Sequence, residues 1–149
     1  PIKVVGIVSK GNACPTAEPK RLSAWPLPNP ALINLNGKIT YIETSRGCPY
    51  RCAFCLSGNT SPLRFFDLDK VKSDIIKVAN SGTQTVKFID RTFNANAKRA
   101  NEILEFILEN RGVQIPENIC FHFEIAGDIL KEETFEILEN APKGLFRRY

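Results

Sequence analysis

From residue 38 onward, this 149-residue chain alternates segments typical of strands with segments typical of helices. Three strands rich in β-branched and aromatic residues are expected at residues 39–44, 85–90 and 119–126. Strands that alternate with helices are usually parallel and joined by right-handed crossovers. A closed (β/α) barrel needs roughly 250 residues. We therefore predict an α/β fold, a partial (β/α) barrel of about three to four βα units, with an open flavodoxin-like sheet as the alternative.

The helices between these strands have recognisable ends. Asp67 is expected to cap the first helix, with Gly82 as its stop. Asn94 or Asn96 is expected to cap the second, which should end at Gly112. A third helix and the start of a fourth strand are expected at residues 131–140 and 144–149.

The first 37 residues have a different character. Residues 2–8 could form a short strand, and five prolines between residues 15 and 30 favour an extended, irregular course. We interpret residues 1–37 as a proline-rich lead-in or linker and residues 38–149 as the N-terminal part of a core domain. Because the chain starts at Pro1 and contains no methionine, we expect that its natural start is missing.

Charge and composition exclude some classes of protein. The net charge of +4 is small and scattered, so there is no strong signal for nucleic acid. No apolar stretch approaches the roughly 20 residues that span a bilayer, so no membrane partner is expected. Five cysteines, an odd number, and no secretory signal favour reduced thiols and a cytoplasmic location.

Three of the cysteines form a tight cluster directly after the first predicted strand. Cys48, Cys52 and Cys55 have the spacing C-x3-C-x2-C, and Gly47 and Pro49 favour a loop there. Thiolates are the ligands of iron–sulfur clusters, which normally take four protein ligands. With only three local thiolates, a 4Fe–4S cluster would keep one iron open to a substrate or cofactor.

This motif resembles that of the radical S-adenosylmethionine (SAM) superfamily, and Phe54 fills the aromatic position before the last cysteine. The resemblance implies that Cys48, Cys52 and Cys55 ligate a 4Fe–4S cluster and that the open iron binds SAM, with Phe54 in the cofactor site. Electron transfer would then cleave SAM to methionine and a 5′-deoxyadenosyl radical, which abstracts hydrogen from a substrate. A radical SAM enzyme of this kind also needs an electron donor for its cluster.

Three sequence segments resemble the cobalamin-associated branch of the superfamily in particular. They are the cysteine motif and the segments at residues 88–94 and 121–124. The resemblance covers about residues 38–146. The lead-in is too short for a cobalamin-binding domain, so cobalamin is expected only through a domain absent from this chain. The second half of the barrel is also absent, which leaves the activity of the chain alone and its substrate open.

Further candidate residues follow the predicted strands, where loops of α/β folds build their sites. In the resembled family, the segment after the second strand holds the amino group of SAM, and Asp90, Arg91 and Thr92 stand there. The alternative is a helix-entry turn with solvated charges. On the third strand, His122 and Glu124 should face the barrel interior. There Glu124 could bind ribose hydroxyls of SAM or a substrate, and His122 could carry a proton or simply pair with Glu124.

Other interpretations of the cluster stay open. A structural zinc site would need a fourth ligand, such as Cys14, Cys120 or His122. A non-enzymatic iron–sulfur module is the second alternative, although electron carriers usually supply four thiolates. The third is an inactive truncated fragment that keeps the motif.

Overall fold

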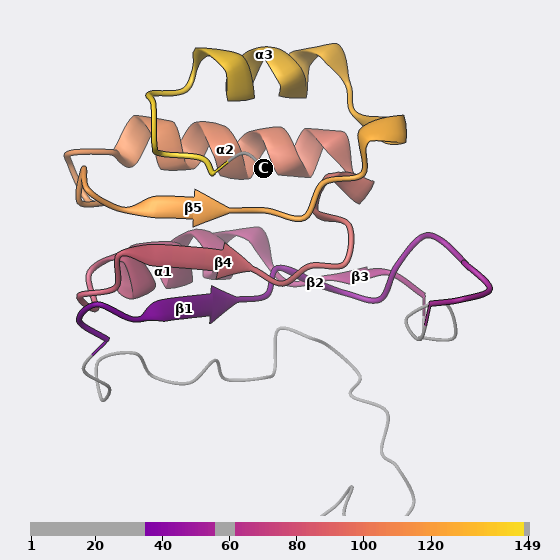
Figure 1. The fold of residues 1–149 in the computed structure, drawn as a ribbon, viewed down its shortest axis with the longest axis horizontal. Helices are drawn as coiled ribbons and strands as arrows, with labels where there is room; N and C mark the ends of the chain where they lie inside the picture. Colours follow the sequence, from indigo (N-terminus) through magenta and orange to yellow (C-terminus); the bar gives the residue numbers. More distant parts are fainter. Residues whose placement is uncertain (1–34, 56–61, 148–149) are drawn as a thin grey trace, which may run out of the picture.

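A computed structural model describes residues 35–55 and 62–147. Its centre is a parallel sheet of three strands, β1 (Ile39–Ile42), β4 (Thr85–Phe88) and β5 (Cys120–His122). The strands stand in the order β1-β4-β5, and their arrows point the same way in Figure 1. The predicted strand at residues 2–8 and most of the lead-in lie outside the described residues.

The strand order distinguishes between the two predicted architectures. In a flavodoxin-like sheet the first strand lies between the second and the third. Here each successive parallel strand is added on the same side, as in a barrel. Phe146 continues the series, because it forms a parallel bridge with Phe121 of β5. The predicted partial barrel and the start of a fourth strand are confirmed.

Three helices connect the strands: α1 (Leu68–Ala79), α2 (Ala97–Asn110) and α3 (Glu132–Asn140). The predicted N-cap of α1 is confirmed, since the Asp67 carboxylate accepts a hydrogen bond from the backbone N–H of Lys70 at 3.0 Å. At α2, Asn96 rather than Asn94 accepts from the Arg99 N–H, at 3.1 Å.

The helices end two to three residues before the predicted glycine stops. α1 ends at Ala79 and α2 at Asn110, while Gly82 and Gly112 lie in the following turns with φ of +88° and +76°. Glycine is favoured there because other residues rarely adopt a positive φ.

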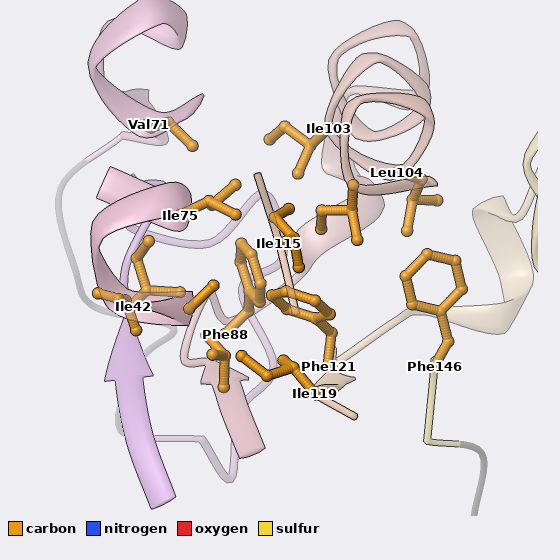
Figure 2. Packing of buried hydrophobic residues seen from close by; sticks show 14 of the residues in the cluster. Ile42, Val71, Ile75, Phe88, Ile103, Leu104, Ile115, Ile119, Phe121 and Phe146 are labelled. Atoms are coloured by element: carbon orange, nitrogen blue, oxygen red, sulfur yellow. The ribbon is translucent and has the colours of Figure 1, made fainter. Parts of the chain in front are cut away.

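The core lies between one face of the sheet and the helices. Figure 2 shows side chains of α1 and α2 meeting those of the strands. The sheet contributes Ile42, Val86, Phe88 and Phe121, and the helices contribute Val71, Ile75, Ile103, Leu104 and Ile107. The predicted apolar face of the third strand is confirmed, because Ile119 and Phe121 are buried and Phe123 and Ile125 pack against the core.

All three predicted strands are shorter in the structure. The first ends at Ile42 rather than residue 44, and the second ends at Phe88 rather than residue 90. The third begins at Cys120 rather than residue 119 and ends at His122 rather than residue 126. Beyond β5 the backbone forms single hydrogen bonds with Phe93 and Asn94 rather than the regular pairing of a strand. It then enters the short 3-10 helix η5 (Gly127–Ile129). Among the described helices, none is both long and apolar enough to cross a membrane.

Candidate cluster and cofactor site

The cysteine motif lies on a loop whose two ends are held together. Strands β2 (Ser45–Arg46) and β3 (Arg64–Phe65) form a short antiparallel pair, and the Phe66 N–H donates to the Thr44 carbonyl at 3.0 Å. We call residues 44–46 and 64–66 the neck, and residues 47–55 the cysteine loop. Figure 1 shows both beyond the carboxyl ends of β1, β4 and β5, where α/β folds build their sites.

Asp90, directly beyond β4, is hydrogen-bonded to the first strand of the neck. Its side chain is 1% exposed, and its carboxylate accepts hydrogen bonds from the Thr44 N–H at 3.1 Å and the Thr44 hydroxyl at 2.8 Å. The Ser45 hydroxyl donates to the same carboxylate at 2.5 Å. A direct contact between Asp90 and an ammonium group would require it to exchange these partners. The geometry favours a role in fixing the start of the cysteine loop.

Arg99 of α2 holds the neck from the helix side. Its Nη2 donates to the Phe66 carbonyl at 2.8 Å and approaches the Thr44 carbonyl at 3.4 Å. The guanidinium carbon also lies 5.2 Å from the centre of the Phe65 ring, within cation–π distance. Burial lowers the pKa of Arg99 from its usual value, and the charge of Asp90 opposes that shift.

The cysteine loop touches the loops that follow both neighbouring strands. The Cys48 Sγ lies 3.6 Å from the Thr92 hydroxyl, beyond β4. The Tyr50 hydroxyl donates to Asp128, beyond β5, at 3.0 Å. Desolvation, followed by the hydrogen bond to Asp128, raises the pKa of Tyr50. The predicted meeting of these three loops at one end of the sheet is therefore present.

The three motif cysteines are not joined in disulfides within the described part of the chain, and they differ in exposure. Cys48 is half-buried beside the neck, while Cys52 and Cys55 are exposed in a turn in which the Cys55 N–H donates to the Cys52 carbonyl at 3.1 Å. Among residues 35–55 and 62–147, no three Cys, His, Asp or Glu side chains are gathered closely enough to hold a metal ion. The chemistry of the donor set fits an iron–sulfur cluster, because soft thiolates are its usual ligands. Binding one requires the turn at Cys52 and Cys55 to close toward Cys48.

The two remaining cysteines are not part of this loop. Cys120 is half-buried at the start of β5, and burial raises the pKa of its thiol. Cys14 lies outside the described residues. The cysteine loop follows the carboxyl ends of the strands, whereas Cys120 begins β5, so Cys120 is poorly placed as the fourth zinc ligand considered from the sequence.

The other predicted site residues lie on exposed or half-buried surface. The Phe54 side chain is 94% exposed, and Arg91 is also exposed. Glu124 is exposed beyond β5, with its carboxylate 3.9 Å from the Lys87 ammonium. His122 is half-buried, and desolvation and then Lys87 lower its pKa, while Glu124 acts in the opposite direction. The structure therefore brings Asp90 and Thr92 to the base of the cysteine loop and leaves Phe54, Arg91 and Glu124 open to a ligand.

Asn94 joins the loops beyond β4 and β5. Its side-chain amide donates to the Ala126 carbonyl at 2.8 Å and accepts from the Ala126 N–H at 2.9 Å. The Phe93 N–H donates to the Glu124 carbonyl at 2.9 Å. These bonds lie within residues 123–126, where the sequence predicts a strand, and β5 ends before them at His122.

Sequence reasoning missed Arg99 and the Thr44–Ser45 hydroxyls. Arg99 precedes Ile103 by four residues, so a basic residue occupies the otherwise apolar stripe of its helix. Thr44 and Ser45 are two hydroxyl residues between a strand and the cysteine motif. These residues can be picked out in the sequence, but the sequence does not show what they bond to. Their hydrogen-bond partners lie 33 to 55 residues away in the chain.

Residues 42–148 match the radical SAM superfamily, and the chain therefore belongs to that superfamily. The superfamily uses SAM and a 4Fe–4S cluster, the cofactors that the cysteine motif implied. The recognition of the family from the C-x3-C-x2-C spacing is confirmed.

Two solved structures of the methyltransferase TsrM from Kitasatospora setae resemble this chain. One, with cobalamin and a 4Fe–4S cluster bound, gives a TM-score of 0.61 at 20% identity over 68% of this chain. The other, with tryptophan substrate and the SAM analogue aza-SAM, gives 0.62 at 21% identity over 80%. At such identities the likeness shows the fold.

A curated relative gives a shorter match. The 2-(S-pantetheinyl)-carbapenam-3-carboxylate methyltransferase of Streptantibioticus cattleyicolor is 40% identical over 53 residues, 34% of this chain. This chain covers 8% of that enzyme and 20% and 23% of the two TsrM chains. It therefore spans less than a quarter of the length of the proteins that it matches.

Proposed function

We propose that this chain is the cluster- and SAM-binding part of a radical SAM enzyme. Cys48, Cys52 and Cys55 would bind a 4Fe–4S cluster, and the iron without a protein ligand would bind SAM. The observation that carries the proposal is the position of the cysteine loop. Three cysteine thiols stand beyond the carboxyl ends of parallel strands, on a neck that Asp90 and Arg99 hold in place.

In this proposal the residues of the chain position the cofactors and exclude water. The neck fixes Cys48, and the turn at Cys52 and Cys55 closes over the cluster. The bound cofactors supply the chemistry, which is one-electron reductive cleavage of SAM to methionine and a 5′-deoxyadenosyl radical. An external electron donor would supply the electron.

Exposed residues around the loop would complete the SAM site. The Phe54 ring, next to Cys55, offers an apolar surface that a bound cofactor would cover. Glu124 offers a carboxylate to ribose hydroxyls, and Arg91 stands on the loop beyond β4. The substrate is a small molecule or macromolecule that these residues do not specify.

Anaerobic reconstitution with iron and sulfide tests the proposal. The wild-type chain should take up about four irons, and its cluster spectrum should change when SAM is added. Cys52→Ala should abolish the cluster, whereas Cys120→Ala, a matched control outside the loop, should retain it. Stoichiometric zinc binding without iron uptake would contradict the proposal. A cluster that does not respond to SAM would identify an inactive fragment.

Methyl transfer is a second candidate for the overall reaction. Both named relatives are methyltransferases, and this specific observation favours it. The two chemistries leave different products from SAM. Reductive cleavage gives 5′-deoxyadenosine after hydrogen abstraction, and transfer of the SAM methyl group to an acceptor gives S-adenosylhomocysteine. Chromatography of reactions that contain the reconstituted chain, SAM, a reductant and added cobalamin as the methyl acceptor separates the two products.

A further inference from the structure

We propose that Thr92 is a positioning residue whose hydroxyl donates a hydrogen bond to the Cys48 thiolate and thereby raises the reduction potential of the cluster. The inference rests on the proposed function and deepens it, because it concerns the regulation of electron transfer at the same site. It starts from one contact, the 3.6 Å between the Thr92 Oγ1 and the Cys48 Sγ. This distance is within the range for hydrogen bonds to sulfur.

The Thr92 hydroxyl has a fixed position. Thr92 is 5% exposed and precedes the 3-10 helix η4 (Phe93–Ala95), whose Ala95 N–H donates to the Thr92 carbonyl at 3.1 Å. On its other side, the Phe93 N–H is bonded to the Glu124 carbonyl and the Phe93 ring is buried in the core. Because the backbone is held and water is largely excluded, the hydroxyl stays directed at the sulfur.

Cys48 is also the thiol whose place the fold determines most firmly. It follows Arg46 by two residues, and Arg46 pairs with Arg64 across the neck. Cys52 and Cys55 are exposed by comparison. Thr92 therefore contacts the ligand that anchors the cluster to the sheet, while the other two ligands close over it.

Ligation settles the direction of the hydrogen bond. In the free thiol either atom could be the donor, but a cysteine that binds iron has lost its proton. The Thr92 hydroxyl is then the donor. A donor at a ligating sulfur stabilises negative charge, and the reduced cluster carries one more negative charge than the oxidised cluster. The hydrogen bond therefore favours the reduced state.

The decisive comparison uses isosteric variants of the reconstituted full chain. Thr92→Val keeps the β-branched shape and removes the donor, whereas Thr92→Ser keeps the donor. Thr83→Val is the matched control. Thr83 is equally buried, but its hydroxyl bonds to the Lys38 carbonyl at 2.6 Å, at the opposite end of the sheet. A redox titration followed by electron paramagnetic resonance measures the cluster potential of each protein.

We expect the potential to become more negative in Thr92→Val and to stay at the wild-type value in Thr92→Ser and Thr83→Val. An unchanged potential in Thr92→Val, with full iron content, would overturn the inference, as would an equal shift in Thr83→Val. If Thr92→Val does not assemble a cluster, the inference is tested on the reduced wild-type chain in D2O. Electron–nuclear double resonance then detects exchangeable deuterons close to the cluster. A deuteron at hydrogen-bond distance from a ligating sulfur, retained in Thr92→Ser, supports the inference, and its absence overturns it.

The outcomes also separate this inference from the proposed function. A wild-type chain that binds no cluster contradicts the proposed function itself. A wild-type chain that binds the cluster and responds to SAM, but whose potential does not depend on the Thr92 hydroxyl, contradicts the role of Thr92 alone.

Discussion

Replacing Asp90 by asparagine tests how the sheet holds the cysteine loop. Asp90 is almost fully buried, and one of its oxygens accepts from the Thr44 and Ser45 hydroxyls at 2.8 and 2.5 Å. The other oxygen accepts from the Thr44 N–H at 3.1 Å. An asparagine can keep one oxygen for the hydroxyls, but its NH2 group then faces the Thr44 N–H, and two donors oppose each other.

The cost follows from these contacts. Hydrogen bonds to a charged group contribute about 1.5–3 kcal/mol and neutral ones about 1, so two hydroxyl bonds that lose the charge cost about 2 kcal/mol together. The Thr44 N–H loses its nearer acceptor, which adds about 1 kcal/mol. Arg99 also loses a nearby counter-charge. We expect Asp90→Asn to lower the free energy of unfolding by about 3 kcal/mol.

Urea unfolding followed by circular dichroism measures this loss. With m of about 1–3 kcal/mol/M for a small protein, a 3 kcal/mol loss moves the midpoint down by about 1–3 M. The matched control is Asp69→Asn in the first turn of α1, where the carboxylate is exposed and only about 0.5 kcal/mol is at stake. A midpoint for Asp90→Asn that coincides with that of Asp69→Asn would refute the reasoning.

Three further substitutions or conditions test other parts of the fold. Phe88→Ala empties a fully buried position in the sheet and should cost about 3–5 kcal/mol in urea unfolding; a loss below 1 kcal/mol would mean that Phe88 is not packed as described. Gly82→Ala should cost about 1–3 kcal/mol, because φ is +88° and the new Cβ would lie 1.9 Å from the Asn36 side-chain oxygen; an unchanged melting temperature would contradict this. Desolvation and Lys87 lower the pKa of His122, so the unfolded chain binds the proton more readily. Stability should be fully present above pH 6.5, the ordinary pKa, and fall as the pH decreases below it, and His122→Gln should weaken that acid-side decrease in thermal melts.

Local patterns were enough to predict the elements and the family. The cap at Asp67, the apolar spacing in α1 and α2, and the alternation along β5 each depend on residues within a few positions of one another. The cysteine motif is equally local, because three thiols that must share one cluster are placed together by a short loop. Strand ends were less accurate, since β5 stops at His122 and the backbone of Ala126 bonds to the Asn94 side chain.

The roles of the residues around the motif depended on contacts that sequence spacing does not contain. Asp90 carried the right charge for an ammonium group, yet its partners proved to be Thr44 and Ser45, 46 and 45 residues away. Thr92 stood in the expected segment, but its contact with Cys48 depends on how the sheet places two loops side by side.

The amino-acid sequence by itself therefore determined the α/β class, the radical SAM family and the three candidate ligands, because each of these depends on short-range chemistry. Only the tertiary structure decided the order of the strands, the neck beneath the cysteine loop and the residues that hold it. Parallel strands are paired through long connections, so the side chains that meet at their carboxyl ends come from positions far apart in the chain.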